Sequence, residues 1–321
     1  MLGPGRSSPG PNEEISCRWS PGNATDNELP GTIDLHHAGI PGAIAAYVVL
    51  DPEPTIIDPG PESAFDELVV GLDELGVGLQ DVGRVVLTHI HLDHAGATGR
   101  IVQEAPRVTV HVHEDGAPHL VDPDKLIKST RRTFGERSDE LWGETLPVPA
   151  SRIRGWRLGD PESLHGLRVL PSPGHIAHHL AFQDEQEGTL FAGDAMGILL
   201  NPEGPVHPPT PPPSLDLEAW YETLTGWAGL DVPRFAATHF GVHQRFHDRR
   251  VELLARLEAL EARVASELEA DIDGSAAYGA EVVDRMSDGG SDERVVEYYN
   301  AFPADAEWHG AAFHLKRRTA D

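Results

Sequence analysis

Short runs of apolar and β-branched residues, bounded by Gly, Pro or polar turn residues, alternate along the chain with segments whose apolar positions recur every three or four residues. The first pattern indicates strands and the second indicates amphipathic helices. Strands are expected at residues 32–36, 43–50, 54–58, 84–88, 107–112, 166–170, 178–183 and 189–192. Helices are expected at residues 64–75, 95–104, 215–230, 251–268 and 293–299. This alternation predicts an α/β fold in which helices cover sheets in layers.

Three segments depart from this alternation. Residues 1–28 are rich in Pro, Gly and Ser without periodicity, which predicts a disordered leader. Residues 114–148 form a mostly helical excursion, and residues 201–213 are too rich in proline for a helix or a central strand. Either of these last two could overhang a site, although a plain surface spacer is an equally good interpretation of the proline-rich segment.

The expected domain organisation follows from these boundaries. After the leader, residues 29–250 are expected to form one domain with residues 114–148 as an insertion. Residues 251–321 begin with a clear amphipathic stripe and continue into Gly-interrupted, charged sequence, so they are expected to form a C-terminal helical segment.

Charge restricts the partners. The chain of 321 residues has 52 acidic and 25 basic side chains, a net charge of −27 that repels nucleic acid and anionic membrane surfaces. No apolar run approaches the length of a membrane span and the N-terminus lacks a signal-peptide core, so a cytoplasmic protein is expected. Such a surface also suits concentrated salt, which predicts a halophilic protein; the alternative is an ordinary acidic enzyme. Complete folding at low ionic strength would argue against salt adaptation.

The chemistry is concentrated in Thr-His-Ile-His-Leu-Asp-His-Ala-Gly at residues 88–96, directly after an expected strand. Imidazoles and carboxylates are preferred ligands of divalent transition metals. Chance clustering is the alternative, because 18 residues are His. Chance does not explain why three further strand-like runs also end in such groups, at His175, Asp194 and His239. The single cysteine, Cys17, lies in the leader, so a metal site here would use nitrogen and oxygen ligands only.

These motifs resemble those of the metallo-β-lactamase superfamily, whose members share His-x-His-x-Asp-His, then Gly-His, Gly-Asp and a final His in that order. The resemblance covers about residues 30 to 245. It implies an αββα four-layer sandwich with helical insertions and a C-terminal appendage. It also implies two divalent metal ions. Zinc is the metal expected first, and iron or manganese would also suit nitrogen and oxygen ligands. The implied ligands are His89, His91 and His175 for one ion, Asp93, His94 and His239 for the other, and Asp194 as the bridge.

The resemblance implies a reaction as well. Two neighbouring ions can lower the pKa of a shared water, so that the metal-bound hydroxide attacks an activated acyl group. Asp194 and Asp93 are the expected catalytic carboxylates, the first as bridge and the second to orient the hydroxide or receive its proton. Asp58 could accept the outer N–H of a ligand imidazole, or could simply form a turn before Pro59. His179 matches a histidine that supports the ligands, whereas His178 has no counterpart.

We therefore expect a hydrolase of a small ester, thioester or lactone, similar to the glyoxalase II-like and lactonase-like members, with a small-molecule substrate and no nucleic-acid or membrane partner. The sequence Gly193-Asp194-Ala195-Met196-Gly197 lacks the tyrosine that homoserine-lactone hydrolases carry after Gly-Asp. The alternative is a mononuclear iron persulfide dioxygenase. A non-catalytic metal-binding protein is disfavoured because no ligand position has been lost. The oligomeric state is open.

Overall fold

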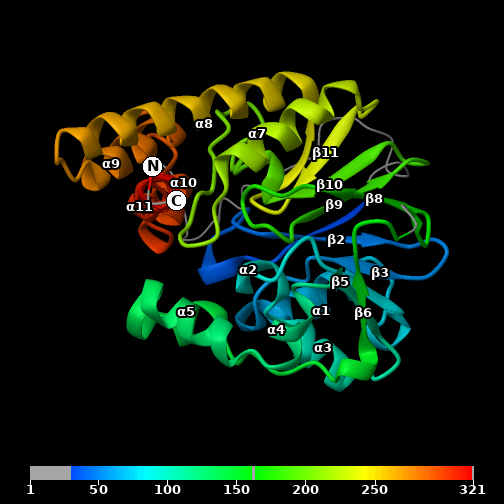
Figure 1. Ribbon diagram of the computed structural model, residues 1–321. Helices are drawn as coiled ribbons and strands as arrows, with labels where there is room; N and C mark the ends of the chain where they lie inside the picture. The colour runs from blue at the N-terminus through cyan, green and yellow to red at the C-terminus, as the bar shows by residue number, and fades with distance from the viewer. Residues whose placement is uncertain (1–29, 161–162, 320–321) are drawn as a thin grey trace, which may run out of the picture.

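Two six-stranded sheets pack against each other, with helices on the outer face of each (Figure 1). The computed structural model describes residues 30–160 and 163–319. The leader expected at residues 1–28, which includes Cys17, therefore lies outside the described residues.

The first sheet has its strands in sequence order. They are β1 (Gly31–Asp34), β2 (Ala45–Val49), β3 (Thr55–Ile57), β4 (Arg84–Val86), β5 (Thr109–His113) and β6 (Ile153–Trp156). The first three strands form an antiparallel meander, and β3 to β6 are parallel. Parallel neighbours need crossover connections, and helices supply those on either side of β4.

The second sheet runs in the order β12-β11-β10-β9-β8-β7. Its strands are β7 (Ser163–Leu164), β8 (Leu167–Pro171), β9 (Leu180–Asp184), β10 (Thr189–Gly193), β11 (Arg234–Ala237) and β12 (Gly241–Gln244). Only β10 and β11 are parallel, and α7 lies in the connection between them.

The core between the sheets joins residues of both. Tyr47 and Val86 of the first sheet pack with Phe182 and Phe191 of the second, and all four are almost fully buried. The Tyr47 hydroxyl donates to the Ala237 carbonyl at 2.5 Å and accepts the Gly241 N–H at 3.0 Å. Because a buried hydroxyl must find partners, these two bonds fix the register of one sheet on the other.

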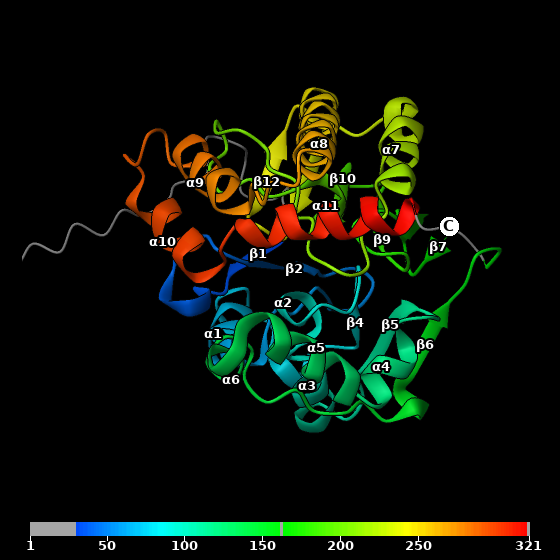
Figure 2. The same ribbon diagram turned by 60° about the vertical axis from the view of Figure 1, so that its left-hand side comes forward.

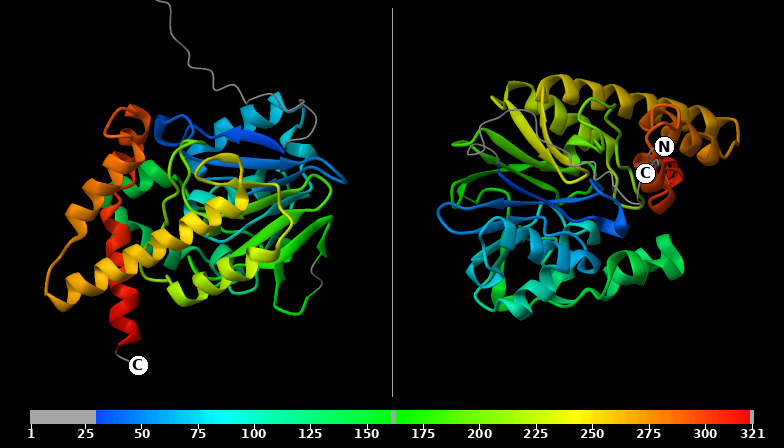
Figure 3. Two further views of the ribbon diagram at one scale, coloured as in Figure 1. Left: turned by 90° about the horizontal axis from the view of Figure 1, so that it is seen from above. Right: turned by 180° about the vertical axis from the view of Figure 1, so that it is seen from behind.

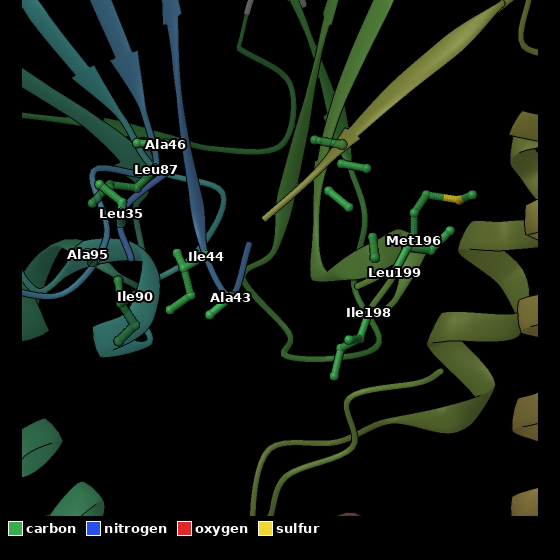
Figure 4. Packing of buried hydrophobic residues seen from close by; sticks show 14 of the residues in the cluster. Leu35, Ala43, Ile44, Ala46, Leu87, Ile90, Ala95, Met196, Ile198 and Leu199 are labelled. Carbon is green, nitrogen blue, oxygen red and sulfur yellow. The ribbon is translucent and has the colours of Figure 1, made fainter. Parts of the chain in front are cut away.

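Helices complete the four layers. Helices α1 (Phe65–Glu74), α2 (Leu92–Ala95) and α3 (Thr98–Glu104) lie on the first sheet, and α7 (Leu217–Gly226) and α8 (Phe246–Glu269) lie on the second (Figure 1). Figure 4 shows buried side chains around the sheet ends, with Ile44 and Ile90 on one side and Ile198 and Leu199 on the other. The αββα sandwich expected from the sequence is confirmed.

Two local details differ from the sequence expectations. The helix expected at residues 95–104 is divided into α2 and α3, and α2 begins at Leu92, so Asp93 and His94 lie on a helical turn. The helix expected from residue 215 begins at Leu217 as α7, where Asp216 caps it by accepting the Ala219 N–H at 3.0 Å. A carboxylate at this position also interacts favourably with the positive end of the helix.

The expected helical excursion at residues 114–148 is present as α4 (Ala117–Val121), α5 (Asp124–Phe134) and α6 (Ser138–Trp142). Helix α5 projects from the sandwich toward the C-terminal helices (Figure 1). The proline-rich segment 201–213, here called the strap, has no helix or strand, in agreement with its composition.

The C-terminal segment is more helical than its sequence suggests. It contains α9 (Ser275–Met286), α10 (Glu293–Ala301) and α11 (Asp305–Arg318), of which only α10 was expected. Helix α11 crosses α8 and packs on α9 (Figures 2 and 3). Across the described residues, we find no helix that combines the length and apolarity needed to cross a membrane.

Candidate metal centre

The seven expected ligands all follow strand ends at the same edge of the sandwich. His89, His91, Asp93 and His94 follow β4 in the first sheet. His175 follows β8, Asp194 follows β10 and His239 follows β11 in the second sheet. Both sheets therefore deliver polar side chains to one place, where the ligand atoms form two groups that could each hold a metal ion.

The first group contains His89, His91, His175 and Asp194, with ligand atoms within 4.8 Å of one another. Nδ1 of His91 lies 2.9 Å from Nε2 of His89 and 2.9 Å from Nε2 of His175. Nε2 of His175 is also 3.3 Å from Oδ2 of Asp194. Three imidazole nitrogens and one carboxylate oxygen thus surround a common point, which is a suitable donor set for zinc, iron or manganese.

The second group contains Asp93, His94, Asp194 and His239. Nε2 of His94 lies 3.3 Å from Oδ1 of Asp194. Nε2 of His239 lies 3.2 Å from Oδ2 of Asp93 and 3.6 Å from Oδ1 of Asp194. Asp194 therefore belongs to both groups and turns a different oxygen to each, which is the arrangement a bridging carboxylate requires.

Bonds on the outer side of the imidazoles decide which nitrogen faces inward. The Pro209 carbonyl can only accept, so Nδ1 of His175 carries the proton in their 2.8 Å bond. By the same reasoning, Nδ1 of His94 donates to Oδ2 of Asp58 at 2.8 Å. In the neutral rings, Nε2 of His175 and Nε2 of His94 consequently present lone pairs to the centre.

Asp58 holds several parts of the centre together. Besides His94, its carboxylate accepts the Thr88 N–H at 2.8 Å, the Thr88 hydroxyl at 2.7 Å and the Thr238 hydroxyl at 3.2 Å. The Thr88 hydroxyl, having donated to Asp58, is an acceptor for Nδ1 of His89 at 3.1 Å. The supporting contact expected of Asp58 is present, and it connects the loops after β3, β4 and β11.

Two buried atoms lack a partner where a metal would bind. Nε2 of His94 and Oδ1 of Asp194 are both buried, and neither has a hydrogen-bond partner in the described part of the chain. Leaving such atoms unsatisfied is costly in a folded protein. Divalent cations in the two groups would satisfy both atoms, so the residues present fit the metals implied by the sequence.

The ionisation of the carboxylates suits metal binding. Burial opposes the charges of Asp93 and Asp194, yet the neighbouring histidines, His94 foremost, hold the pKa of each carboxyl well below its usual range. Burial lowers the pKa of His91 to about 3, helped by the neighbouring His175. At neutral pH these groups therefore offer anionic oxygens and an unprotonated imidazole.

Gly193 allows the close approach that places Asp194. Its φ is +51°, and a Cβ here would lie 2.6 Å from the Thr88 hydroxyl oxygen and 2.8 Å from Nε2 of His179. His179 accepts the Asp194 N–H at 3.3 Å through Nε2 and donates from Nδ1 to the Ser172 hydroxyl at 2.7 Å. It therefore supports the bridge, in the role expected for it, while His178 lines the adjoining pocket.

Tyr298 is a component that the sequence reasoning missed. Its hydroxyl oxygen lies 3.1 Å from Nδ1 of His239 and it comes from α10, about 60 positions further along the chain. Nε2 of His239 faces the centre, so Nδ1 is the donor to this oxygen, and the hydroxyl hydrogen remains free to point into the pocket that Tyr298 lines. A tyrosine therefore lies beside the centre. It comes from α10, and not from the segment after Gly193-Asp194, in which a tyrosine is missing.

A pocket of about 720 Å³ lies over the centre. Its base includes His91, Asp93, His175, Asp194 and His239, and its walls come from α5 and α6, the strap, and α10 with α11. The wall side chains are mainly apolar and include Leu126, Phe134, Trp142, Pro209, Pro211, Pro212, Pro213 and Phe302. Both segments considered as possible overhangs, 114–148 and 201–213, therefore contribute to the pocket.

The remaining histidines and aromatics divide between pocket and core. His119 lines the pocket. His207 does not, because it is fully buried between Glu307 and Arg285. Trp142 both packs and lines the pocket, and Trp220 is a core residue whose Nε1 donates to the Ala195 carbonyl at 3.0 Å.

Comparison with known families agrees with this geometry. The family model described as "Metallo-beta-lactamase superfamily" matches residues 39–239, which include all seven side chains. The chain belongs to the metallo-beta-lactamase superfamily. Its members in the comparisons include hydrolases by name, such as the probable metallo-hydrolase YqjP of Bacillus subtilis, which is 29% identical over 172 residues covering 48% of this chain and 53% of YqjP. The chain spans about half the length of several curated relatives that it matches.

Two solved structures resemble the fold over most of their length. The metallo-beta-lactamase family protein TTHA1429 from Thermus thermophilus is 26% identical, with a TM-score of 0.60 over 86% of this chain and 89% of its own. TTHA1623, solved in a di-iron-bound form, is 26% identical, with a TM-score of 0.50 over 64% of this chain and 92% of its own. The comparisons thus support the fold, a candidate metal-binding site and a relation to metallo-hydrolases. They do not indicate a particular branch of the superfamily.

Proposed function

We propose that this protein is a dinuclear metal-dependent hydrolase of a small ester, thioester or lactone, in the glyoxalase II-like or lactonase-like branch of the superfamily. His89, His91 and His175 hold one divalent ion, Asp93, His94 and His239 hold the other, and Asp194 bridges them. Zinc is the proposed metal, with iron and manganese also suited to these donors.

One observation carries the proposal. Oδ2 of Asp194 lies 3.3 Å from Nε2 of His175, and Oδ1 of the same carboxylate lies 3.3 Å from Nε2 of His94. The two imidazoles belong to separate ligand groups, and the carboxylate between them is almost fully buried. A buried carboxylate divided in this way between two donor sets supports two ions rather than one.

The chain's own residues supply positioning and proton transfer. When bound, ions at these positions lower the pKa of a coordinated water and polarise an acyl carbonyl. Asp93 is half-buried and faces the pocket, and its depressed pKa keeps the carboxylate ionised, so the oxygen that does not bind the second ion can orient a coordinated water or receive its proton. The Tyr298 hydroxyl is placed to donate to an oxygen of the substrate. The apolar walls exclude water from the acyl group, which strengthens these interactions.

The test is a panel of simple thioesters, esters and lactones offered to the full chain before and after removal of metal by a chelator. Hydrolysis that disappears on chelation and returns with added zinc, iron or manganese supports the proposal. Absence of hydrolysis in the fully metallated protein overturns it. Oxygen uptake with a persulfide, without hydrolysis, would instead support the mononuclear iron dioxygenase.

A further inference from the structure

The charges of helix α5, which forms one wall of the pocket, are unlike those of the rest of the protein. Acidic side chains outnumber basic ones by 52 to 25 in the chain. Helix α5, in contrast, carries four basic residues and one acidic residue, and holds two of the three lysines. Helix α5 forms the wall of the pocket that faces α10 and α11 (Figure 1). A basic helix in an acidic protein therefore stands at the entrance to the candidate centre.

Only some of these cations are directed to the pocket. Of the four on α5, Lys125 lines it, and so does Arg137 in the short turn Gly135–Arg137 that follows α5. Lys128 does not; it pairs with Asp124 at 3.6 Å, as Arg131 pairs with Asp139 at 3.0 Å.

The two pocket cations are not neutralised by carboxylates. Lys125 forms no ion pair within residues 30–160 and 163–319. Among the same residues, the guanidinium of Arg137 reaches only the carbonyl oxygens of Asn300 and Ala301, at 3.4 and 3.5 Å. Both side chains are exposed, so they lie where the pocket opens to solvent and can meet a charged group without being buried.

The acidic residues of the pocket are placed elsewhere. Asp93 and Asp194 belong to the candidate metal groups. Glu307 is buried and bonded to His207, and Asp305 lies in the first turn of α11, where the helix dipole offsets its charge. The α5 side of the entrance is therefore the side that attracts an anion, while the interior is apolar.

We propose that the substrate is an amphipathic anionic thioester or ester. Its apolar acyl group lies among the prolines and aromatics of the pocket, and its leaving group carries phosphate or carboxylate charges that Lys125 and Arg137 bind at the entrance. The charge is assigned to the leaving group because the cations are exposed and the inner walls are apolar, so the charged part extends outward. This inference rests on the proposed hydrolase function.

A pair of substrates isolates the anionic group. Hexanoyl-coenzyme A and hexanoyl-N-acetylcysteamine share the acyl chain and the thioester bond, and only the first carries phosphates. The metallated full chain is expected to have a higher kcat/KM for the coenzyme A thioester. Lys125→Gln and Arg137→Gln are each expected to lower the ratio of the two kcat/KM values about fivefold, mainly through KM, as expected for an exposed ion pair. Rising salt concentration should lower the same ratio.

Lys128→Gln is the matched control, because Lys128 lies on the same helix, already has a carboxylate partner and is outside the pocket. It should leave the ratio unchanged. A ratio near one in the unsubstituted protein, or equal effects of Lys125→Gln and Lys128→Gln, would overturn the inference while leaving the hydrolase intact.

Binding of desulfo-coenzyme A, measured by calorimetry, separates the two proposals further because it has no thioester and no thiol. About fivefold weaker binding to Lys125→Gln than to Lys128→Gln supports anion recognition at the entrance even if no thioester is hydrolysed, in which case the hydrolase proposal alone fails. Equal binding to both variants, or no binding to the unsubstituted protein, counts against the anionic leaving group.

Discussion

The Tyr298 hydroxyl lies 3.1 Å from Nδ1 of His239, so that α10 of the C-terminal segment contacts the candidate metal centre directly behind one of its ligands. The strap makes a comparable contact on the other side, where the Pro209 carbonyl accepts from His175. The strap is in turn held by α11, because the Thr210 hydroxyl donates to the Glu307 carbonyl at 3.0 Å. The C-terminal helices thus support both halves of the centre.

Tyr298→Phe should weaken metal binding at the second group. The hydroxyl orients the His239 ring, and loss of such an outer contact typically costs about tenfold or more in metal affinity. Tyr221→Phe is the control, since Tyr221 of α7 donates to Glu261 of α8 at 2.9 Å and does not line the pocket. Competition with a chromophoric chelator measures both variants; equal affinities for the second metal equivalent would show that Tyr298 does not position His239.

Asp58→Asn should destabilise the protein even without metal. Asp58 accepts four hydrogen bonds, and an amide in its place would turn an NH₂ group toward a donor, at a cost of about 2–3 kcal/mol in the free energy of unfolding. Asp184→Asn is the comparison, because Asp184 accepts the backbone N–H groups of Gln186 and Glu187, which an amide oxygen can still receive. Urea denaturation of both chelated variants would refute the role of Asp58 if their losses were similar.

Metal binding should release protons at neutral pH. Burial lowers the pKa of His94, but the carboxylates of Asp194 and Asp93 outweigh this and raise it well above its usual value in the metal-free chain. His94 must lose that proton to become a ligand, so apparent metal affinity should rise with pH through and above neutrality. Calorimetry in buffers of different ionisation enthalpy gives the number of protons; a value of zero would contradict this assignment.

The same shifts set the pH dependence of folding without metal. A raised pKa of His94 contributes stability that is complete below pH 6.5, the usual His value, and disappears as pH rises through the folded-state value. A depressed pKa of Asp194 contributes stability that is complete above its usual value of 3.8 and is lost below it. Buried imidazoles with depressed pKa values, among them His91 at about 3, act the other way: they stay neutral in the folded chain, so stability falls below about pH 6.5 as the unfolded chain takes up protons. The chelated protein should therefore be most stable near neutrality and lose stability towards acidic pH. Thermal unfolding across pH tests this, and a maximum at alkaline pH would be inconsistent with it.

Gly310→Ala should loosen the strap. A Cβ on Gly310 would lie 1.7 Å from the Thr210 carbonyl oxygen, so α11 or the strap must move, at a cost of about 1–3 kcal/mol. Gly226→Ala in α7 meets nothing within 4 Å and should be neutral or slightly stabilising. Melting temperatures of the two variants compare the sites, and similar values would mean that the contact at Gly310 carries no packing constraint.

Most side chains of the candidate centre could be predicted from the sequence, because they lie in short motifs or directly after predicted strands. His89, His91, Asp93 and His94 lie within six positions, and each remaining ligand directly follows an apolar strand. Strand ends of a layered α/β fold meet at one edge, so the pattern also predicted that these segments converge. The contact of Asp58 with His94 was one of two interpretations that the sequence left open, the other being a turn before Pro59.

The contacts that the C-terminal segment makes with the centre and the strap could not be predicted in this way. Tyr298 and Thr210 meet partners about 60 and 100 positions away, and no local periodicity encodes such contacts. The glycines of the segment suggested interruption, yet Gly279 and Gly310 lie inside helices, and Gly310 permits the close approach of α11 to the strap. Tertiary packing thus overrode the weak helix propensity of glycine. The domain division at residue 251 and the salt adaptation stay predictions.

The most direct test is metal content measured by elemental analysis of the full chain purified with excess metal. We expect two equivalents per chain, falling to one or fewer in Asp194→Ala, together with loss of hydrolysis, because this carboxylate faces both ligand groups. Two equivalents retained in Asp194→Ala would contradict a shared bridge, and one equivalent in the unsubstituted protein would contradict a dinuclear centre.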